Sequence, residues 1–191
     1  EKKHRRVISA KKILIAGAGP AGLEAAKKSA ERGFKTILCT KDNKLGGMLN
    51  DAAIPPEKQD LIKFVENKKY ELEQLGVDIR YNTEVNGDLI RGLSPYFVID
   101  ATGSSAVIPP IKGIDKGCVH MALDVLNCSQ QDLAKLKKGN TVIIGGGSVG
   151  LETAMYIARE VGIYQDGDLA LTSDELREIN DIELQKIVSS V

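Results

Sequence analysis

The chain has 191 residues, of which 42% are hydrophobic and 27% are charged, a composition typical of soluble globular proteins. This length predicts one domain or two small ones. The 26 Lys and Arg residues balance the 26 Asp and Glu residues, which argues against a general nucleic-acid-binding protein. No stretch is long and apolar enough for a membrane span, and the first ten residues lack the apolar core of a secretory signal, so we expect no membrane association.

The cysteines and histidines are few and scattered. Cys39, Cys118 and Cys128 form no Cys-x-x-Cys pair, and only His4 and His120 accompany them. This pattern predicts neither a disulfide scaffold nor a metal site, and it favours a reducing, cytoplasmic compartment. We also expect no catalytic side chain, because His120 is more simply explained as structural.

The start of the chain predicts a strand–turn–helix–strand unit. Lys12–Ala16 is a short apolar run typical of a buried parallel strand, and the glycine-rich turn GAGPAG follows it at Gly17–Gly22. An alanine-rich helix is then expected to end near Gly33, before a second strand at Thr36–Thr40.

The middle of the chain continues the alternation of helices and strands. We expect an amphipathic helix at Glu57–Leu75 and strands at Val77–Tyr81 and Tyr96–Asp100. Between these two strands, residues 83–95 are expected to hold a short strand and a short helix. A glycine loop precedes the long helix at Lys44–Asn50, and the turn Ala101–Gly103 follows the last strand. A short polar helix is expected at Gln130–Lys138.

The opening pattern then returns, which indicates an internal duplication. Asn140–Ile144 predicts a strand, Gly145–Gly150 repeats the glycine turn as GGGSVG, and a helix follows. Ser173–Val188 has helical periodicity, but the strand that should follow a helix of this kind is missing. The acidic residues 162–191 are therefore expected to be poorly ordered or swapped, and the chain is expected to be a fragment of a larger protein.

Both turns have the form G-x-G-x-x-G, whose glycines have separate physical roles. The first glycine permits the tight turn, the second lets a pyrophosphate approach the backbone, and the third lets helix and strand pack closely. These roles fall on Gly17, Gly19 and Gly22, and again on Gly145, Gly147 and Gly150. The alternative is that the glycines only allow the turn to pack against a sheet and bind no phosphate. This alternative carries more weight for the second turn than for the first.

One position departs from the usual dinucleotide pattern. The end of the second strand normally carries an acidic residue that binds ribose hydroxyls. Here Thr40 stands there, followed by Lys41 and Asp42. A threonine hydroxyl offers fewer bonds than a carboxylate, so tight adenosine binding is less strongly predicted, and Asp42 would substitute only if the loop folds back.

Four motifs in order carry a resemblance to a known family. KILIAGAGPAGLEAA, KLGGMLN, VIDATGS and TVIIGGGSVGLETA resemble the flavoproteins with two dinucleotide-binding domains, in the enoate reductase, 2,4-dienoyl-CoA reductase and trimethylamine dehydrogenase group. The resemblance covers about residues 11–160. It implies an α/β, Rossmann-like three-layer fold with a parallel sheet: a linker at 1–10, an FAD-binding domain at 11–138 and a partial NAD(P)-binding domain with an acidic helical tail at 139–191.

The resemblance also implies which residues bind cofactors. The ADP part of FAD, or ADP in its place, would bind the first turn and the segments that follow neighbouring strands, with Val85 presenting its backbone to adenine: Gly17, Ala18, Gly19, Pro20, Ala21, Gly22, Thr40, Lys41, Gly46, Gly47, Met48, Val85, Ala101, Thr102 and Gly103. NADH or NADPH would bind the second turn: Gly145, Gly147, Ser148, Val149, Gly150 and Glu152.

The implied function is hydride transfer from NAD(P)H to FAD and onward to partner redox centres. FMN and a 4Fe-4S cluster are expected only on missing upstream parts, so the partners are other domains or subunits of the same flavoenzyme, with homo-oligomers possible and nucleic acid and membrane excluded. An alternative is a non-redox ADP-binding module of a larger assembly. A disulfide reductase of the thioredoxin reductase kind ranks last, since it requires a Cys-x-x-Cys.

Overall fold

The computed structural model describes residues 11–129, 132–133 and 140–160 and divides the chain into two compact units, Glu1–Lys112 and Gly113–Val191. The division lies earlier in the chain than the domain boundary expected after residue 138. The expected linker at 1–10, the acidic tail and most of the short helix at 130–138 lie outside the described residues.

The first unit contains a four-stranded parallel sheet in the order β3-β2-β1-β4. Its strands are β1 (Lys12–Ala16), β2 (Lys35–Cys39), β3 (Asp78–Arg80) and β4 (Phe97–Asp100). Its helical segments are α1 (Pro20–Glu31), α2 (Leu49–Ala52), η1 (Pro56–Lys58), α3 (Asp60–Gln74) and α4 (Gly87–Leu93). The α/β, Rossmann-like fold class is therefore confirmed.

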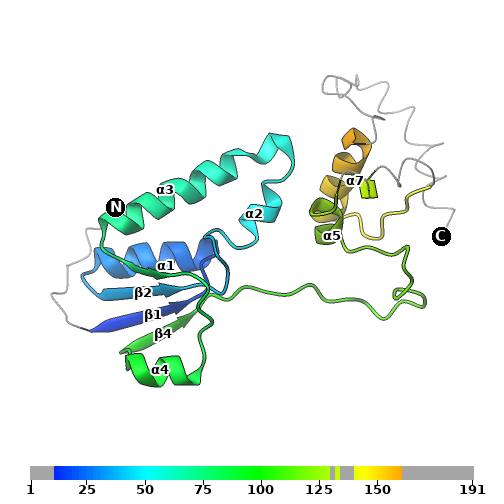
Figure 1. Cartoon of the computed structure of the whole chain (residues 1–191). Coiled ribbons are helices and arrows are strands. Elements are labelled where there is room, and N and C mark those ends of the chain that lie inside the picture. The colour runs from blue at the N-terminus through cyan, green and yellow to red at the C-terminus, as the bar shows by residue number, and fades with distance from the viewer. Residues whose placement is uncertain (1–10, 130–131, 134–139, 161–191) are drawn as a thin grey trace. The chain divides into compact units, whose positions relative to one another are not determined.

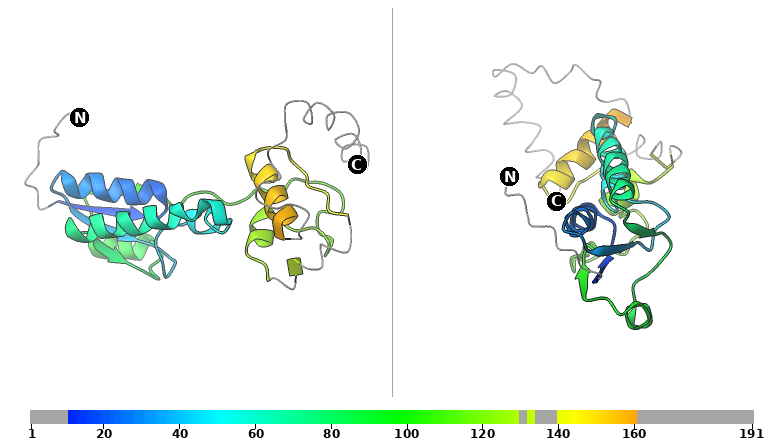
Figure 2. Two further views of the ribbon diagram at one scale, coloured as in Figure 1. Left: turned by 90° about the horizontal axis from the view of Figure 1, so that it is seen from above. Right: turned by 90° about the vertical axis from the view of Figure 1, so that its left-hand side faces the viewer.

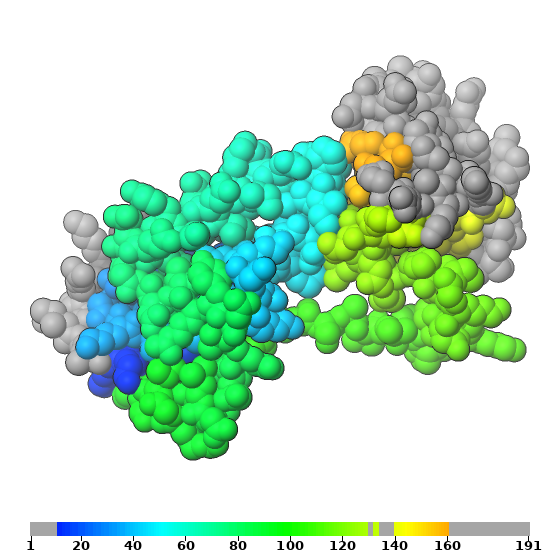
Figure 3. Space-filling model, viewed as in Figure 1, coloured from blue at the N-terminus to red at the C-terminus, as the bar shows by residue number. Residues whose placement is uncertain are grey.

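Helices cover both faces of this sheet, which makes three layers. In Figure 1, α1 and α3 lie on one face and α4 lies on the other. In the view from above, α1 and α3 run side by side (Figure 2), and the space-filling view shows α3 at the outer surface of its layer (Figure 3). The outward side of α3 carries charged residues, as its amphipathic sequence predicts.

Alternating side chains of the strands supply the two cores. Ile15 and Leu38 point to the α1 and α3 face, where they pack with Leu23 and Leu72. The intervening residues Leu14, Ile37 and Cys39 point to the opposite face, where α4 covers them with Leu89, Ile90 and Leu93. Each central strand is thus apolar on both sides, as expected for a parallel strand between two helical layers.

The helix boundaries follow from local sequence. Pro20 at the first turn has the backbone φ that begins α1, and Gly33 ends it with a φ of 91° and an N–H bond to the Ala30 carbonyl. For α4, the Asn86 side chain accepts a hydrogen bond from the Leu89 N–H at 2.9 Å.

The strand predicted within 83–95 is not formed, because the described chain enters α4 directly from the loop after β3. The long helix predicted at Glu57–Leu75 is divided into the short turn η1 and α3, with Gln59 between them.

The strand β4 is an edge of the sheet in the described part of the chain. Phe97 is 58% exposed and Val98 is 42% exposed, although they point to opposite faces. The Tyr96 ring packs edge-on against Phe97, with centroids 4.5 Å apart, and Lys11 lies over the Tyr96 ring.

The described residues of the second unit form two helices, α5 (Ala122–Leu126) and α7 (Ser148–Glu160), which pack against each other. The strand predicted at Asn140–Ile144 is not formed, and this prediction is wrong for the structure described. Val142 is 51% exposed and Ile144 is 71% exposed. A parallel strand requires a hydrogen-bonded neighbour, and no other described segment of this unit is a strand.

Ion pairs join α1 to α3 across their outer edges. Lys68 Nζ bonds the Glu24 carboxylate at 2.7 Å, and Lys27 Nζ bonds Glu71 at 2.8 Å. Hydrogen bonding to Lys68 lowers the pKa of Glu24, and hydrogen bonding to Lys27 lowers the pKa of Glu71.

These lowered pKa values predict acid-sensitive stability. Because the carboxylates bind protons more weakly in the folded chain, their contribution is present above the unfolded value of about 4.3 and is lost as pH falls through the lower folded values. Lys68→Met is expected to reduce the melting temperature by a few degrees at neutral pH and to flatten its decline in acid. Thermal melts at several pH values would check this, with Lys35→Met, at the exposed start of β2, as the control. An unchanged acid profile would contradict it.

Candidate functional site

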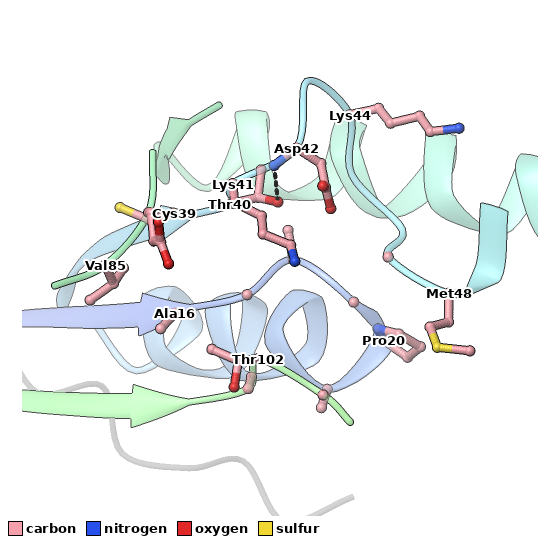
Figure 4. A pocket seen from close by; sticks show the side chains of 18 of the residues that line it. Ala16, Pro20, Cys39, Thr40, Lys41, Asp42, Lys44, Met48, Val85 and Thr102 are labelled. Carbon is pink, nitrogen blue, oxygen red and sulfur yellow. Dashed lines mark hydrogen bonds between the residues drawn. The ribbon is translucent and has the colours of Figure 1, made fainter. Parts of the chain in front are cut away.

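The main cavity of the first unit opens at the carboxyl ends of the parallel strands. Its volume is about 980 Å³, and it begins at the ends of β1 and β2, beside Ala16 and Cys39. The segments after β3 and β4 complete its walls, as Figure 4 shows. Ligands of open parallel sheets bind at this edge, where neighbouring strands run to helices on opposite faces.

The first glycine turn has the geometry that a phosphate-binding turn requires. Gly17 has a φ of 99°, and a Cβ there would lie 2.2 Å from the Ala101 carbonyl oxygen. A Cβ on Gly22 would lie 1.8 Å from the Gly17 carbonyl oxygen. Gly19 differs, because no atom lies within 4 Å of a Cβ built on it. Two glycines therefore close the turn, and the middle one leaves open space above the backbone.

The start of α1 offers hydrogen-bond donors to an anion in that space. The first N–H groups of a helix have no acceptor within the helix, and the helix dipole makes this end positive. Gly19 caps α1 without a side-chain hydrogen bond, and the first turn contains no acidic residue that would repel an anion. A pyrophosphate fits this turn through backbone groups alone.

A second loop, which lies between β2 and α2, contacts the first glycine turn. The Gly46 N–H donates to the Ala18 carbonyl at 2.8 Å, and Gly47, with a φ of 52°, lies against Gly19. The Asn50 amide holds the loop by donating to the carbonyls of Leu45 at 2.9 Å and Gly47 at 3.0 Å. These hydrogen bonds hold the loop in its conformation without a ligand.

The turn after β4 forms the lower wall in Figure 4. The Asp100 carboxylate accepts hydrogen bonds from the Thr102 hydroxyl at 2.8 Å and the Thr102 N–H at 3.0 Å. These bonds lower the pKa of Asp100. Gly103 follows with a φ of 83°, so the chain leaves the sheet in a sharp turn.

The structure brings most of the residues predicted for the first site to this one cavity. Its lining contains the following predicted residues: Gly17, Ala18, Gly19, Pro20, Ala21, Thr40, Lys41, Gly47, Met48, Val85, Ala101, Thr102 and Gly103. Gly22 and Gly46 are not among the lining residues. Gly22 allows α1 to pack closely against the turn after β1, and the Gly46 N–H holds its loop by a hydrogen bond to Ala18.

Sequence reasoning missed several lining residues: Ala16, Cys39, Lys44, Asn50, Asp51, Thr83, Glu84 and Ser104. The rule that ligands meet the carboxyl ends of parallel strands would have found Thr83 and Glu84, because they follow β3. Cys39 is fully buried, and burial raises the pKa of its thiol, so it stays neutral at the cavity wall.

The second glycine turn shares the close approach of its third glycine and the open space at its middle glycine with the first turn, but no atom lies within 4 Å of a Cβ built on Gly145. Gly145 has a φ of 110°, and a Cβ on Gly150 would lie 1.9 Å from the Gly145 carbonyl oxygen. No atom lies within 4 Å of a Cβ built on Gly147. Ser148, Val149 and Glu152 lie in the first turns of α7.

The described residues offer neither a cluster of metal ligands nor a membrane-spanning helix. They contain no group of three His, Cys, Asp or Glu side chains arranged to hold a metal ion. Among the same residues, no helix is long and apolar enough to cross a membrane.

Comparison with known proteins defines the class. The model of the pyridine nucleotide-disulphide oxidoreductase family matches residues 11–186. The chain therefore belongs to this family of FAD/NAD-binding domains, and the resemblance drawn from the four motifs is confirmed.

The relatives are oxidoreductases. The chain is 38% identical over 148 residues to the bilirubin reductase of Mediterraneibacter gnavus, covering 78% of this chain and 22% of that protein. It is 41% identical over 152 residues to the NADH oxidase of Thermoanaerobacter brockii, covering 78% and 23%. The fold is similar to that of a 2-naphthoyl-CoA reductase, with a TM-score of 0.70 and 29% identity over 82% of this chain and 23% of that one. The chain thus spans less than a quarter of each of these proteins.

Proposed function

We propose that the chain is the nucleotide-binding part of an NAD(P)H-dependent flavoprotein reductase. The first turn and its cavity hold the ADP portion of FAD, and the second turn receives NADH or NADPH. The observation that carries this proposal is the repeated turn, with open space above Gly19 and again above Gly147. Two phosphate-binding turns in one chain suit an enzyme that brings two dinucleotides together.

The residues of the chain bind and orient rather than react. Bound flavin supplies the hydride-accepting chemistry, as is general for cofactor enzymes. The backbone donors at the start of α1 fix the pyrophosphate, and the Gly46–Gly47 loop supports the turn by its bond to Ala18 and its contact with Gly19. No acid or base from this chain is required for the transfer itself.

The remaining assignments extend the same proposal. FMN and a 4Fe-4S cluster are placed outside this chain, on other domains or subunits of the same flavoenzyme, which are its partners. A cytoplasmic location is supported by cysteines that are free in the structure. A homo-oligomer is compatible with this arrangement, and nucleic acid and membranes are not among the proposed partners.

A substitution at Gly19 tests the first site. Gly19→Ala is expected to weaken binding of ADP and FAD at least about tenfold, because its Cβ takes the space through which a phosphate reaches the backbone. Folding should change by no more than about 1 kcal/mol, since the added Cβ meets no protein atom. Isothermal titration calorimetry with each nucleotide, paired with a thermal melt, separates the two effects.

Gly92→Ala is the control, because Gly92 also has open space around it but lies on α4, outside the cavity lining. Its nucleotide affinity should equal that of the unsubstituted chain. Failure of the unsubstituted chain to bind either nucleotide would overturn the proposal.

A second candidate is a non-redox module that holds ADP within a larger assembly. Thr40 in place of an acid and the unpaired segment Asn140–Ile144 favour it. Mass spectrometry of the nucleotide released by acid from the purified full-length protein decides between the two. Release of FAD supports the reductase, and release of ADP or of nothing supports the module.

A further inference from the structure

We propose that Asp42 supplies the carboxylate that binds a ribose hydroxyl of the nucleotide at the first turn. This assignment rests on the proposed function and specifies one side chain of its first site. It gives Asp42 the role that an acidic residue at the end of the second strand usually has.

Thr40, which occupies the usual position, is poorly suited to that role. Its residue is only 4% exposed, and its Oγ1 already accepts a hydrogen bond from the Asp42 N–H at 3.2 Å. Ribose hydroxyls bound to a carboxylate act as donors, and a carboxylate has about four acceptor positions. The Thr40 hydroxyl has one lone pair left and is turned into its own loop.

The backbone around Asp42 is held in place from both sides. Its N–H donates to Thr40, and its carbonyl accepts from the Asn82 N–H at 3.0 Å. Thr40 is itself tied to the segment after β3, since the Thr83 N–H donates to its carbonyl at 2.7 Å and its own N–H donates to the Arg80 carbonyl at 2.9 Å. The loop therefore folds back, which the sequence left open.

This fixed loop directs the Asp42 carboxylate into the cavity. Asp42 is exposed and belongs to the cavity lining, together with the glycine turn. Figure 4 shows its side chain directed toward that turn, whereas the Lys44 side chain is directed away. A nucleotide whose pyrophosphate lies on the turn would place its ribose toward the end of β2.

The surrounding charges favour a ribose with free hydroxyls over a phosphorylated one. Lys41 and Lys44 are the basic residues of the lining, and Asp42, Asp51 and Glu84 are the acidic ones. An additional phosphate on the ribose would meet the Asp42 carboxylate and be repelled by it. Free hydroxyls would instead donate to it.

The direction in which Asp42→Asn changes the affinity for ADP distinguishes a carboxylate that binds the ribose from one that only lies near the nucleotide. A carboxylate that merely stood near the pyrophosphate would repel it, so removing the charge would tighten binding. A ribose ligand behaves in the opposite way, and Asp42→Asn is then expected to weaken ADP binding about tenfold. Asp42→Glu, which retains a carboxylate on a longer side chain, should restore part of the affinity.

The experiment is calorimetric titration of the 191-residue chain and its variants with ADP, 2′-deoxy-ADP and 3′-deoxy-ADP. The unsubstituted chain should prefer ADP over at least one deoxy analogue, and Asp42→Asn should lose that preference. Asp88→Asn, which removes the same charge from α4 outside the lining, should behave like the unsubstituted chain.

Two results would overturn the assignment: ADP binding that is equal or tighter in Asp42→Asn, or undiminished discrimination against the deoxy analogues. A thermal melt of each variant shows whether a loss of affinity comes from unfolding, and the deoxy comparison holds within any variant that folds. Absence of ADP and FAD binding to the unsubstituted chain would instead reject the proposed function, which is a separate outcome.

Discussion

Replacing Gly22 by alanine is expected to destabilise the first unit by about 3 kcal/mol or more. The added Cβ would lie 1.8 Å from the Gly17 carbonyl oxygen, and that atom belongs to the backbone of the turn, so no side-chain rotation can relieve the overlap. Either α1 moves away from β1 or the turn opens. Both changes disturb the core where Leu23 packs beside Ile15.

Urea unfolding followed by far-UV circular dichroism measures this effect. Gly92→Ala is the matched control, since the same change in α4 meets open space and removes a flexible residue from a helix. It should leave stability unchanged or raise it by up to about 1 kcal/mol. Equal stability of Gly22→Ala and Gly92→Ala would show that the close contact has no energetic consequence.

Leu72→Ala is expected to have the next largest effect, a loss of about 2–5 kcal/mol. Leu72 is fully buried between α3 and the sheet, so the shorter side chain leaves a cavity that its neighbours fill only in part. Unfolding should remain cooperative within the first unit, with a lower midpoint in urea and a similar slope.

Leu75→Ala supplies the comparison on the same helix. Leu75 is 39% exposed and caps the end of α3, so its truncation should cost less than about 1 kcal/mol. If both variants lost the same stability, α3 would not be held to the sheet by the contacts of Leu72.

The first unit was predictable because local signals and packing agree there. The apolar runs of β1 and β2 and Gly33 each mark a boundary that the structure places within a residue or two of the expected position, whereas α1 begins at Pro20, inside the predicted glycine turn. The helix α3 shows the limit of such reasoning. The helical spacing of its apolar residues would make Phe64 and Leu75 core positions like Leu72, but Phe64 is 42% exposed and lies beside Lys68 instead.

The glycine turn of the candidate site could be predicted from the sequence, whereas the segment after β3 and the Asp42 loop could not be placed in the same way. A glycine turn needs particular residue types, whereas the segment after β3 lines the cavity only because β3 lies beside β2. The position of Asp42 depends on its N–H donating to Thr40 and its carbonyl accepting from Asn82, two residues that are far apart in sequence. The segment Asn140–Ile144 has the residues of a strand, but extended backbone becomes a strand only when a neighbour pairs with it.

The two glycine turns share the close approach of the third glycine to the carbonyl oxygen of the first, although only the first turn follows a strand that is paired in a sheet. This contact is therefore made within the G-x-G-x-x-G segment itself, whereas the contact of Gly17 with Ala101 depends on the neighbouring strand β4. Under the proposed function, repetition of this short segment supplies the chain with its second phosphate-binding turn.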